Sequence, residues 1–414
     1  MNRDLDDPVH RPMLRELEAV VAQDPQHGRV VVLRDLEGIA EGHAVLPPAL
    51  VPIIGRFNGA LTCAEIADEA TKELGEPIPA RLVASLAREL DEALLLEGRR
   101  FDEARARVVK QFADAAVREA SHAGGAYHAD PTELARYIDE KCLGVVAPRE
   151  RDGRRLVGLI APHIDPWRGA QSYGHAYAAL AGALHSDVRT FVVLGTSHAA
   201  MREPFALCRK AFDTPFGPFD ADLEAIDALA AAAPFDPYAD LFNHKREHSL
   251  EFQAVFIKHL LKEREARIVP ILAGLGRRGR DDGATVDDGT DHVVSTLAAI
   301  VARSAERTVL VAGVDLAHVG PRFGDAAAYG AAARARLERA DRESLAFAAE
   351  RDATGFFRHV AGDLETRRVC GLAPIHALLR ALPGTARGEL LHYEQTVDEH
   401  DGSIVSHAAM AFYA

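Results

Sequence analysis

The stretch GLIAPHIDPWRG at residues 158–169 begins as an apolar run and ends as a polar loop. The run that starts at Leu156 has the length of a buried strand, and Pro162 ends it. His163 and Asp165 follow, on a loop that a second proline stiffens. Open α/β sheets bind ligands beyond the carboxyl ends of their strands, so this stretch predicts one side of a binding site. A solvated histidine at an ordinary strand exit is the alternative.

Further apolar runs of strand length follow, and Ala-rich segments with helical spacing separate them. The runs are TFVVLGT (190–196), ARIVPILAG (266–274), TVLVAGVD (308–315), ELLHYEQ (389–395) and SHAAMAFYA (406–414). Alternating strands and helices of this kind are typical of parallel sheets that are covered on both sides. The sequence therefore predicts an α/β fold with a central, mostly parallel sheet and helices on both faces.

Three of the predicted strands end close to a histidine. His163 follows the first run, His198 follows TFVVLGT, and His318 follows TVLVAGVD, which itself ends in Asp315. Parallel strands present their carboxyl ends at one edge of a sheet, so these imidazoles can converge. Two imidazoles and one anionic donor suit a divalent transition metal. We expect a metal or acid–base site here, and three unrelated loop histidines are the alternative.

Two other segments can supply a further donor. EHSLE (247–251) places Glu247, His248 and Glu251 at the start of a predicted helix, where a capped helix with surface acids is the alternative. RRVCGLAPIHALL (367–379) places Cys370 at the start of another helix. A thiolate is a good soft ligand, although a lone cysteine is often simply buried.

The first hundred residues follow a different pattern. RVVVLRD (29–35) and the apolar residues around Ala44–Leu46 predict a hairpin, and PPALVPIIGRFNG (47–59) predicts a helix. Thr62 is the predicted N-cap of a second helix, and residues 77–98 predict a third helix that runs into an apolar edge and a turn. We expect a small α+β winged-helix-like domain over residues 1–100. A charged helical linker over 101–120 then leads to a second domain over 121–414.

The segment FNGALTCAEIADEATKELGEPIPARLVASLARELDEALLLEG (57–98) resembles PqqD-like domains. That resemblance implies a module that docks a peptide or a protein partner. Winged helices often bind DNA, but the presumed recognition helix (79–96) carries only two arginines, no lysine and three acids. DNA binding is therefore not expected.

Composition narrows the class of protein. Of the 414 residues, 48% are hydrophobic and 27% are charged, as in soluble globular proteins. No apolar run approaches the roughly 20 residues of a membrane helix, and the acidic start MNRDLDDPVHRPM lacks the pattern of a signal peptide. A net charge of −14 disfavours nucleic acid as a partner, and four cysteines without a CxxC pair indicate a reducing compartment. We expect a cytoplasmic protein with no membrane or nucleic-acid partner.

Six blocks in order carry a family resemblance. GLIAPHID, VVLGTSHA, EHSLEFQ, VAGVDLAHVG, VCGLAPI and HYEQTVDEHDGSIVSHAAMAFYA resemble the Memo family, which includes system protein B of the bacterial AmmeMemoRadiSam set. With a similar opening at 118–140, the resemblance covers roughly residues 117–414. It implies a fold similar to class III extradiol dioxygenases of the LigB type, which hold one Fe(II) with two histidines and a carboxylate.

Carried over by position, the resemblance implies His163, His198 and Cys370 as metal ligands, because Memo proteins present a cysteine in place of the carboxylate. His318 matches the general base of the dioxygenases, with Asp315 beside it. Fe(II) is the expected metal, and copper or zinc is the alternative because a thiolate also suits them. Glu247, His248 and Glu251 match the family's EHS block, at the rim of the site or behind its ligands.

The sequence departs from the family pattern in the pocket, so the substrate does not carry over. The departures are at 164–167 (IDPW), Ala199 and Ala373. Asp165, unusual at its place, is a candidate for an extra carboxylate ligand or base. Two functions follow: an iron-dependent oxidoreductase acting on a small or peptide-borne substrate, or a non-enzymatic metal-binding or redox adaptor that docks a partner. A zinc hydrolase has little support because HExxH is absent.

Overall fold

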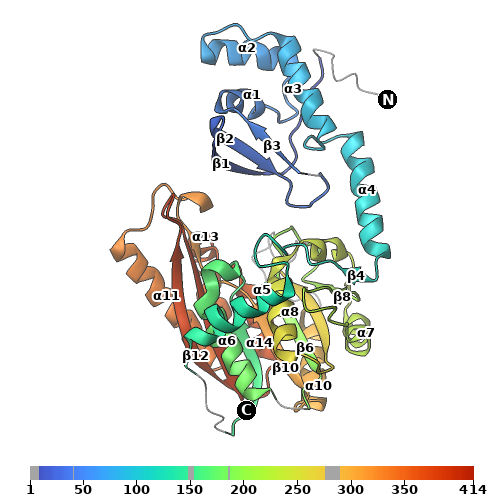
Figure 1. Cartoon of the computed structure of the whole chain (residues 1–414), viewed down its shortest axis with the longest axis vertical. Coiled ribbons are helices and arrows are strands. Elements are labelled where there is room, and N and C mark those ends of the chain that lie inside the picture. Colours follow the sequence, from blue (N-terminus) through green and yellow to red (C-terminus); the bar gives the residue numbers. More distant parts are fainter. Residues whose placement is uncertain (1–8, 41, 148–152, 185–186, 276–289) are drawn as a thin grey trace. The chain divides into compact units, whose positions relative to one another are not determined.

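The computed structural model describes residues 9–40, 42–147, 153–184, 187–275 and 290–414. The start of the acidic N-terminal stretch therefore lies outside the described residues. The chain forms two compact units, residues 1–114 and 115–414 (Figure 1). No helix among the described residues is both long and apolar enough to cross a bilayer.

The first unit holds an antiparallel sheet in the order β1-β2-β3, followed by helices. Its strands are β1 (Glu18–Asp24), β2 (Gly28–Arg34) and β3 (His43–Leu46), and its helices are η1 (Pro48–Leu50), α1 (Val51–Ile54), α2 (Cys63–Leu74), α3 (Ala80–Glu92) and α4 (Arg99–Asp114). The predicted hairpin is β2 and β3, and Thr62 caps α2 as predicted, in a reciprocal pair with Glu65. The strand β1 was not predicted from the sequence.

Two predicted helices are shorter than expected. The helix predicted over 47–59 ends at Ile54, because the next residues pair with the N-terminal segment: Leu14 donates its backbone N–H to Phe57. The helical linker predicted over 101–120 ends at Asp114, because the chain then forms β4 (Val117–Arg118), which pairs with β8 (Ala211–Phe212).

The second unit is built on a sheet in the order β11-β13-β5-β10-β6-β9-β7, with β12 beside β13. The four strands β5, β10, β6 and β9 are parallel, and antiparallel strands lie on both sides of them. The strand bounds are β5 (Leu156–Ala161), β6 (Thr190–Thr196), β7 (Phe205–Leu207), β9 (Arg267–Ala273), β10 (Thr308–Gly313), β11 (His318–Val319), β12 (Arg387–Val397) and β13 (Ile404–Tyr413). The predicted α/β class with a mostly parallel central sheet is confirmed.

Helices cover both faces of this sheet (Figure 1). Alternate residues of β6 point to opposite faces: Phe191 and Val193 join one buried cluster, whereas Val192 and Leu194 join the other. One cluster includes α5 (Pro131–Tyr137), α6 (Pro166–Ala183) and α8 (His248–Leu261), and the other includes α7 (Leu223–Ala232), α10 (Thr290–Arg303), α11 (Ala331–Ala349), α12 (Ala353–Ala361) and α14 (Leu372–Ala381). Shorter helical segments are η2 (Ile138–Cys142), η3 (Leu143–Val145), η4 (Leu241–Lys245), η5 (Pro321–Phe323) and α13 (Leu364–Arg367).

Candidate metal centre

The strands β5, β10 and β6 lie side by side and run in the same direction. Their carboxyl ends therefore meet at one edge of the sheet, as predicted. His163 follows β5, Asp315 follows β10 and His198 follows β6. The same edge receives the start of α8, which carries His248 directly after Glu247.

Two glycines let α8 approach this edge. Gly195 and Gly313 are register partners at the ends of β6 and β10. A Cβ on Gly313 would lie 2.3 Å from the backbone oxygen of Ser249, and a Cβ on Gly195 would lie 2.4 Å from the Ser249 hydroxyl oxygen. That hydroxyl donates to the carbonyl oxygen of Thr196 at 2.8 Å. Because neither glycine has a side chain, the first turn of α8, with His248, can pack directly against the strand ends.

Three imidazoles gather at this point. One ligand nitrogen from each of His163, His198 and His248 lies within 4.8 Å of the others. The ring centroids of His163 and His198 are 5.1 Å apart, and those of His198 and His248 are 4.6 Å apart and nearly parallel. His248 was predicted to lie at the rim of the site or behind its ligands, but it lies within the cluster itself.

His163 is fully buried and held in one orientation. Its Nδ1 lies 3.1 Å from the carbonyl oxygen of Gly313, and its backbone N–H donates to Asp315 Oδ1 at 2.9 Å. A carbonyl oxygen can only accept, so Nδ1 carries the proton. Nε2 is left with a lone pair on the side of the cluster, the arrangement of a metal-ligating histidine.

Glu247 orients His198 in the same way. The Nδ1 of His198 lies 3.1 and 3.0 Å from the two carboxylate oxygens of Glu247. The same carboxylate accepts the backbone N–H groups of His198 and Ser249, each at 2.9 Å. His198 therefore presents Nε2 to the cluster, and Glu247 fixes both the strand end and the helix start.

The electrostatics keep two of the three imidazoles neutral. Burial lowers the pKa of His163 to about 4, although Asp315 opposes the shift. Burial also lowers the pKa of His248 well below its usual value, against the pull of Glu247. Burial alone would lower the pKa of His198 too, but Glu247 outweighs it and raises that pKa. At neutral pH, His163 and His248 are therefore free to donate lone pairs.

Most of this chain matches one known protein family. The sequence profile of a family described as "Memo-like protein" matches residues 118–411. The chain belongs to the Memo-like family. The match includes every strand of the sheet that carries the histidines, with β13 matched up to residue 411.

Several relatives in the Memo-like family are similar over long stretches. A MEMO1 family protein of Aquifex aeolicus is 28% identical over 393 residues, which is 94% of this chain and 97% of the relative. A MEMO1 family protein of Thermus thermophilus is 33% identical over 64% of this chain and 73% of its own length. One from Methanosarcina barkeri is 26% identical, with 99% of its length matched to 71% of this chain. We call residues 115–414 the Memo-like unit. The match to the Aquifex aeolicus protein is much longer than this unit, whereas the match to the Methanosarcina barkeri protein is about as long as the unit.

Cys370 lies beside the histidines of the Memo-like unit. Its Sγ is 3.5 Å from His163 Nε2 and 3.4 Å from the carbonyl oxygen of Asp315. The Thr196 hydroxyl donates to the Cys370 carbonyl oxygen at 2.8 Å, which ties the start of α14 to the end of β6. Burial, followed by the charge of Asp315, raises the pKa of the thiol. A bound cation would reverse that shift, because a coordinating thiol loses its proton.

His318 and Asp315 come from the segment after β10. The Nδ1 of His318 lies 3.2 Å from the carbonyl oxygen of Leu316, so its Nε2 is also left with a lone pair. Burial lowers the pKa of His318, although Asp315 opposes the shift. The Asp315 carboxylate is buried, and its Oδ2 lies 3.8 Å from His163 Nε2.

Asp165 has a structural role in the Memo-like unit. It is the N-cap of α6, and its carboxylate accepts the backbone N–H of Arg168 and pairs with that side chain. These contacts cap α6, and a further role of Asp165 as a ligand or base stays a prediction. The neighbouring Trp167 packs edge-on against His128 and Tyr137, with ring centroids 4.8 and 4.7 Å apart.

Glu251 lies one turn after His248 and is buried together with Arg118. It also accepts from Tyr127 and from the backbone N–H of His122. The His122 ring lies 5.6 Å from that of His248 and extends the histidine cluster. His122 was not predicted as part of the site, because it lies in a loop without the hydrophobic periodicity of a helix or strand. Its position within the 118–140 family block was the one available clue.

Proposed function

We propose that the protein is a metal-dependent oxidoreductase with a mononuclear centre held by His163, His198 and Cys370. The preferred metal is Fe(II), with copper or zinc as the alternatives that a thiolate ligand also suits. His248 stands within reach of the same ion. The observation that carries the proposal is the group of three imidazoles, whose ligand atoms lie within 4.8 Å of one another.

The side chains fit a transition metal in spacing and in chemistry. Ligand atoms bonded to one ion at roughly 2.0–2.3 Å lie no more than about 4.6 Å apart, so the cluster needs only a small contraction. Gly313 and Glu247 fix the tautomers of His163 and His198, as partners of metal-bound histidines do. The low pKa values of His163 and His248 remove the competition from protons.

A redox-active ion in this position supplies the electron-transfer chemistry that the side chains cannot provide. The remaining steps belong to the protein. His318 accepts a proton from a substrate hydroxyl through its Nε2, because its Nδ1 is engaged by the Leu316 carbonyl oxygen. The buried Asp315 carboxylate stabilises the imidazolium that results, since its charge favours protonated His318.

Oxygen consumption tests this function. Protein loaded with Fe(II) under anaerobic conditions is mixed with oxygenated buffer and a panel of catechols and hydroxylated peptides. We expect substrate-dependent oxygen uptake that falls by roughly 10²–10⁴-fold in His318→Ala, the contribution of a general base. The exposed His292→Ala on α10 is the matched control and keeps full activity. Uptake that is equal in His318→Ala and wild type contradicts the assigned role.

A second function has support in the first unit. Thirteen large apolar side chains are exposed among the described residues, and eight of them lie before residue 115. The eight are Val9, Met13, Val21, Leu36, Val45, Val51, Leu74 and Leu82. This distribution suits an adaptor that docks a protein or peptide partner through the first unit. No uptake across the substrate panel, with partner capture that Val21→Asp abolishes, would favour the adaptor.

A further inference from the structure

The proposed mechanism does not use a buried carboxylate on α11. Asp341 is fully buried, and it accepts hydrogen bonds from side chains of three other elements. Arg367 donates to Oδ1 at 3.0 Å, and the hydroxyls of Ser406 and Tyr393 donate to Oδ2 at 2.6 and 2.9 Å. The carboxylate therefore joins α11 to the short helix α13 and to the strands β13 and β12.

Ser406 connects this carboxylate to the segment that carries His318. Its hydroxyl oxygen accepts the backbone N–H of Ala317 at 2.9 Å, and its carbonyl oxygen accepts that of Leu316 at 2.7 Å. The carbonyl oxygen of Leu316 in turn lies 3.2 Å from Nδ1 of His318. A serine hydroxyl has one hydrogen to donate, and Asp341 accepts it, so the oxygen lone pairs are left for Ala317. The carboxylate thereby fixes the backbone just before the candidate base.

Arg367 connects the same carboxylate to the segment that carries Cys370. It lies three residues before the thiol, and its side chain is 3% exposed. The next residue, Arg368, has a left-handed backbone with a φ of 51°, which costs free energy in a residue with a side chain. The two neighbouring guanidinium groups have different partners. That of Arg367 contacts Asp341, whereas that of the next residue donates to the His318 carbonyl oxygen at 3.2 Å.

Stability alone is a poor explanation for this carboxylate. Burial raises the pKa of Asp341, although Ser406, Tyr393 and Arg367 all oppose the shift. Burial therefore outweighs the stabilisation that the three donors give to the charged form. A buried ion pair often contributes no more to the free energy of unfolding than well-packed apolar side chains of similar volume. Apolar side chains, however, cannot hold polar groups of several segments in fixed directions.

We propose that Asp341 is a positioning residue of the candidate centre. Through Ser406 it holds the segment that carries His318, and through Arg367 it holds the segment that carries the thiol. This inference rests on the proposed function, in which the thiol binds the metal and the imidazole accepts a proton from the substrate. Asp341 acts on both groups through other residues, so substituting it leaves the ligands and the base in place.

Amide hydrogen exchange, followed by mass spectrometry, tests the positioning without metal or substrate. We expect Asp341→Asn to speed exchange in residues 314–320 and 366–372 by at least about ten-fold, because a charge-assisted hydrogen bond is lost on each side. Exchange in β6, residues 190–196, should stay as in the wild type. Faster exchange that is confined to the two segments shows a local effect rather than a general loss of stability.

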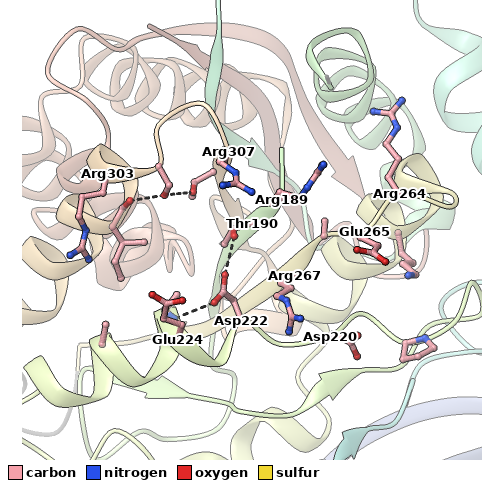
Figure 2. Close-up of a pocket in the computed structure, with 18 of the residues that line it drawn as sticks. Arg189, Thr190, Asp220, Asp222, Glu224, Arg264, Glu265, Arg267, Arg303 and Arg307 are labelled. Carbon is pink, nitrogen blue, oxygen red and sulfur yellow. Dashed lines mark hydrogen bonds between the residues drawn. The ribbon is translucent and has the colours of Figure 1, made fainter. Parts of the chain in front are cut away.

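Asp222→Asn is the matched control for this measurement. Asp222 also joins a strand to a helix, because it accepts the Thr190 hydroxyl at 2.9 Å and the backbone N–H of Ala225 at 3.2 Å (Figure 2). It lies where β6 begins, at the sheet edge opposite the histidines. We expect Asp222→Asn to leave exchange in both segments unchanged.

Steady-state kinetics of oxygen uptake supply a second readout. At equal metal content, Asp341→Asn should lower kcat by at least about ten-fold and keep KM within about two-fold, because the base is displaced while substrate binding is not. Tyr393→Phe removes a donor from the same carboxylate, but β12 carries neither the base nor the thiol. It should keep kcat, and an equal fall of kcat in Tyr393→Phe would overturn the proposal.

The exchange measurement decides the proposal independently of turnover. Wild-type exchange in both segments of folded Asp341→Asn would overturn it, as would equal acceleration in β6. If Asp341→Asn does not fold, Ser406→Ala replaces it and should speed exchange in 314–320 but not in 366–372; unchanged exchange in 314–320 overturns the proposal as well. Absence of oxygen uptake in the wild type contradicts the proposed function instead, so the two failures are distinguishable.

Discussion

The substitution Glu247→Gln keeps the shape of the side chain and removes its charge. The carboxylate of Glu247 accepts the Nδ1–H of His198 and the backbone N–H groups of His198 and Ser249. An amide has one acceptor oxygen, so its NH₂ group must face at least one of these donors. The imidazole of His198 then loses its fixed orientation. Loss of such a partner typically weakens metal binding by about 10–100-fold, or about 1.4–2.7 kcal/mol.

The effect of this substitution depends on pH in a defined direction. Burial lowers the pKa of His198, and Glu247 is the main reason that the pKa is nevertheless raised. Below that raised pKa, His198 of the wild type is protonated and must release the proton to bind metal. Without the charge of Glu247 the pKa of His198 is lower, so in the variant this release occurs at a lower pH. The affinity gap between the two proteins is therefore largest above the raised pKa and narrows as the pH falls through it.

The assay is an anaerobic competition titration against a coloured chelator, at several values between about pH 5.5 and 8. Glu343→Gln is the matched control, because Glu343 also lies near a histidine, 3.5 Å from His359, but outside the candidate centre. We expect it to bind metal as the wild type does. Folded Glu247→Gln that binds metal within about two-fold of wild type at every pH would refute the assigned role of Glu247.

Three further predictions concern other buried groups. Cys370→Ser should remove any sulfur-to-metal absorption band from the loaded protein, whereas Cys208→Ala should keep it; a band that survives Cys370→Ser excludes the thiolate ligand. Arg118→Leu should cost about 3–5 kcal/mol of unfolding free energy in urea, because Glu251 is left buried without its partner, and adding Glu251→Leu should restore much of that loss. His244 has a pKa lowered by burial to about 4, so as the pH falls from 6.5 the unfolded chain gains a proton that the folded protein does not. Between pH 6.5 and about 4, this residue should cost the wild type about 3 kcal/mol of unfolding free energy, measured by urea unfolding at each pH. The unfolding free energy of His244→Gln should fall by correspondingly less over the same range. Equal slopes of unfolding free energy against pH in the two proteins contradict this.

The sequence could predict the central sheet because parallel strands buried on both faces are continuous apolar runs. TFVVLGT, for example, is β6 from its first residue to its last. The strand β1 was missed because its apolar run, AVVA (19–22), is short and none of its residues is buried. The predicted convergence at one sheet edge was correct for His163 and His198, since strand direction alone determines which edge they reach.

The position of His248 could not be predicted from the sequence. It depends on how closely α8 approaches the sheet, which the two adjacent glycines Gly195 and Gly313 set through space. His122 likewise reaches the cluster through the buried contacts of Glu251, which join residues more than a hundred positions apart. Local patterns carry no information about such contacts.

The most direct test of the central claim is X-ray absorption spectroscopy, with metal analysis, on protein purified without oxygen. The account predicts about one transition metal per chain, with nitrogen scatterers near 2.0–2.1 Å and one sulfur near 2.3 Å. It also predicts that His163→Ala/His198→Ala holds no metal. Metal retained by that folded double variant, or a wild-type protein that takes up none after anaerobic iron loading, would contradict the account.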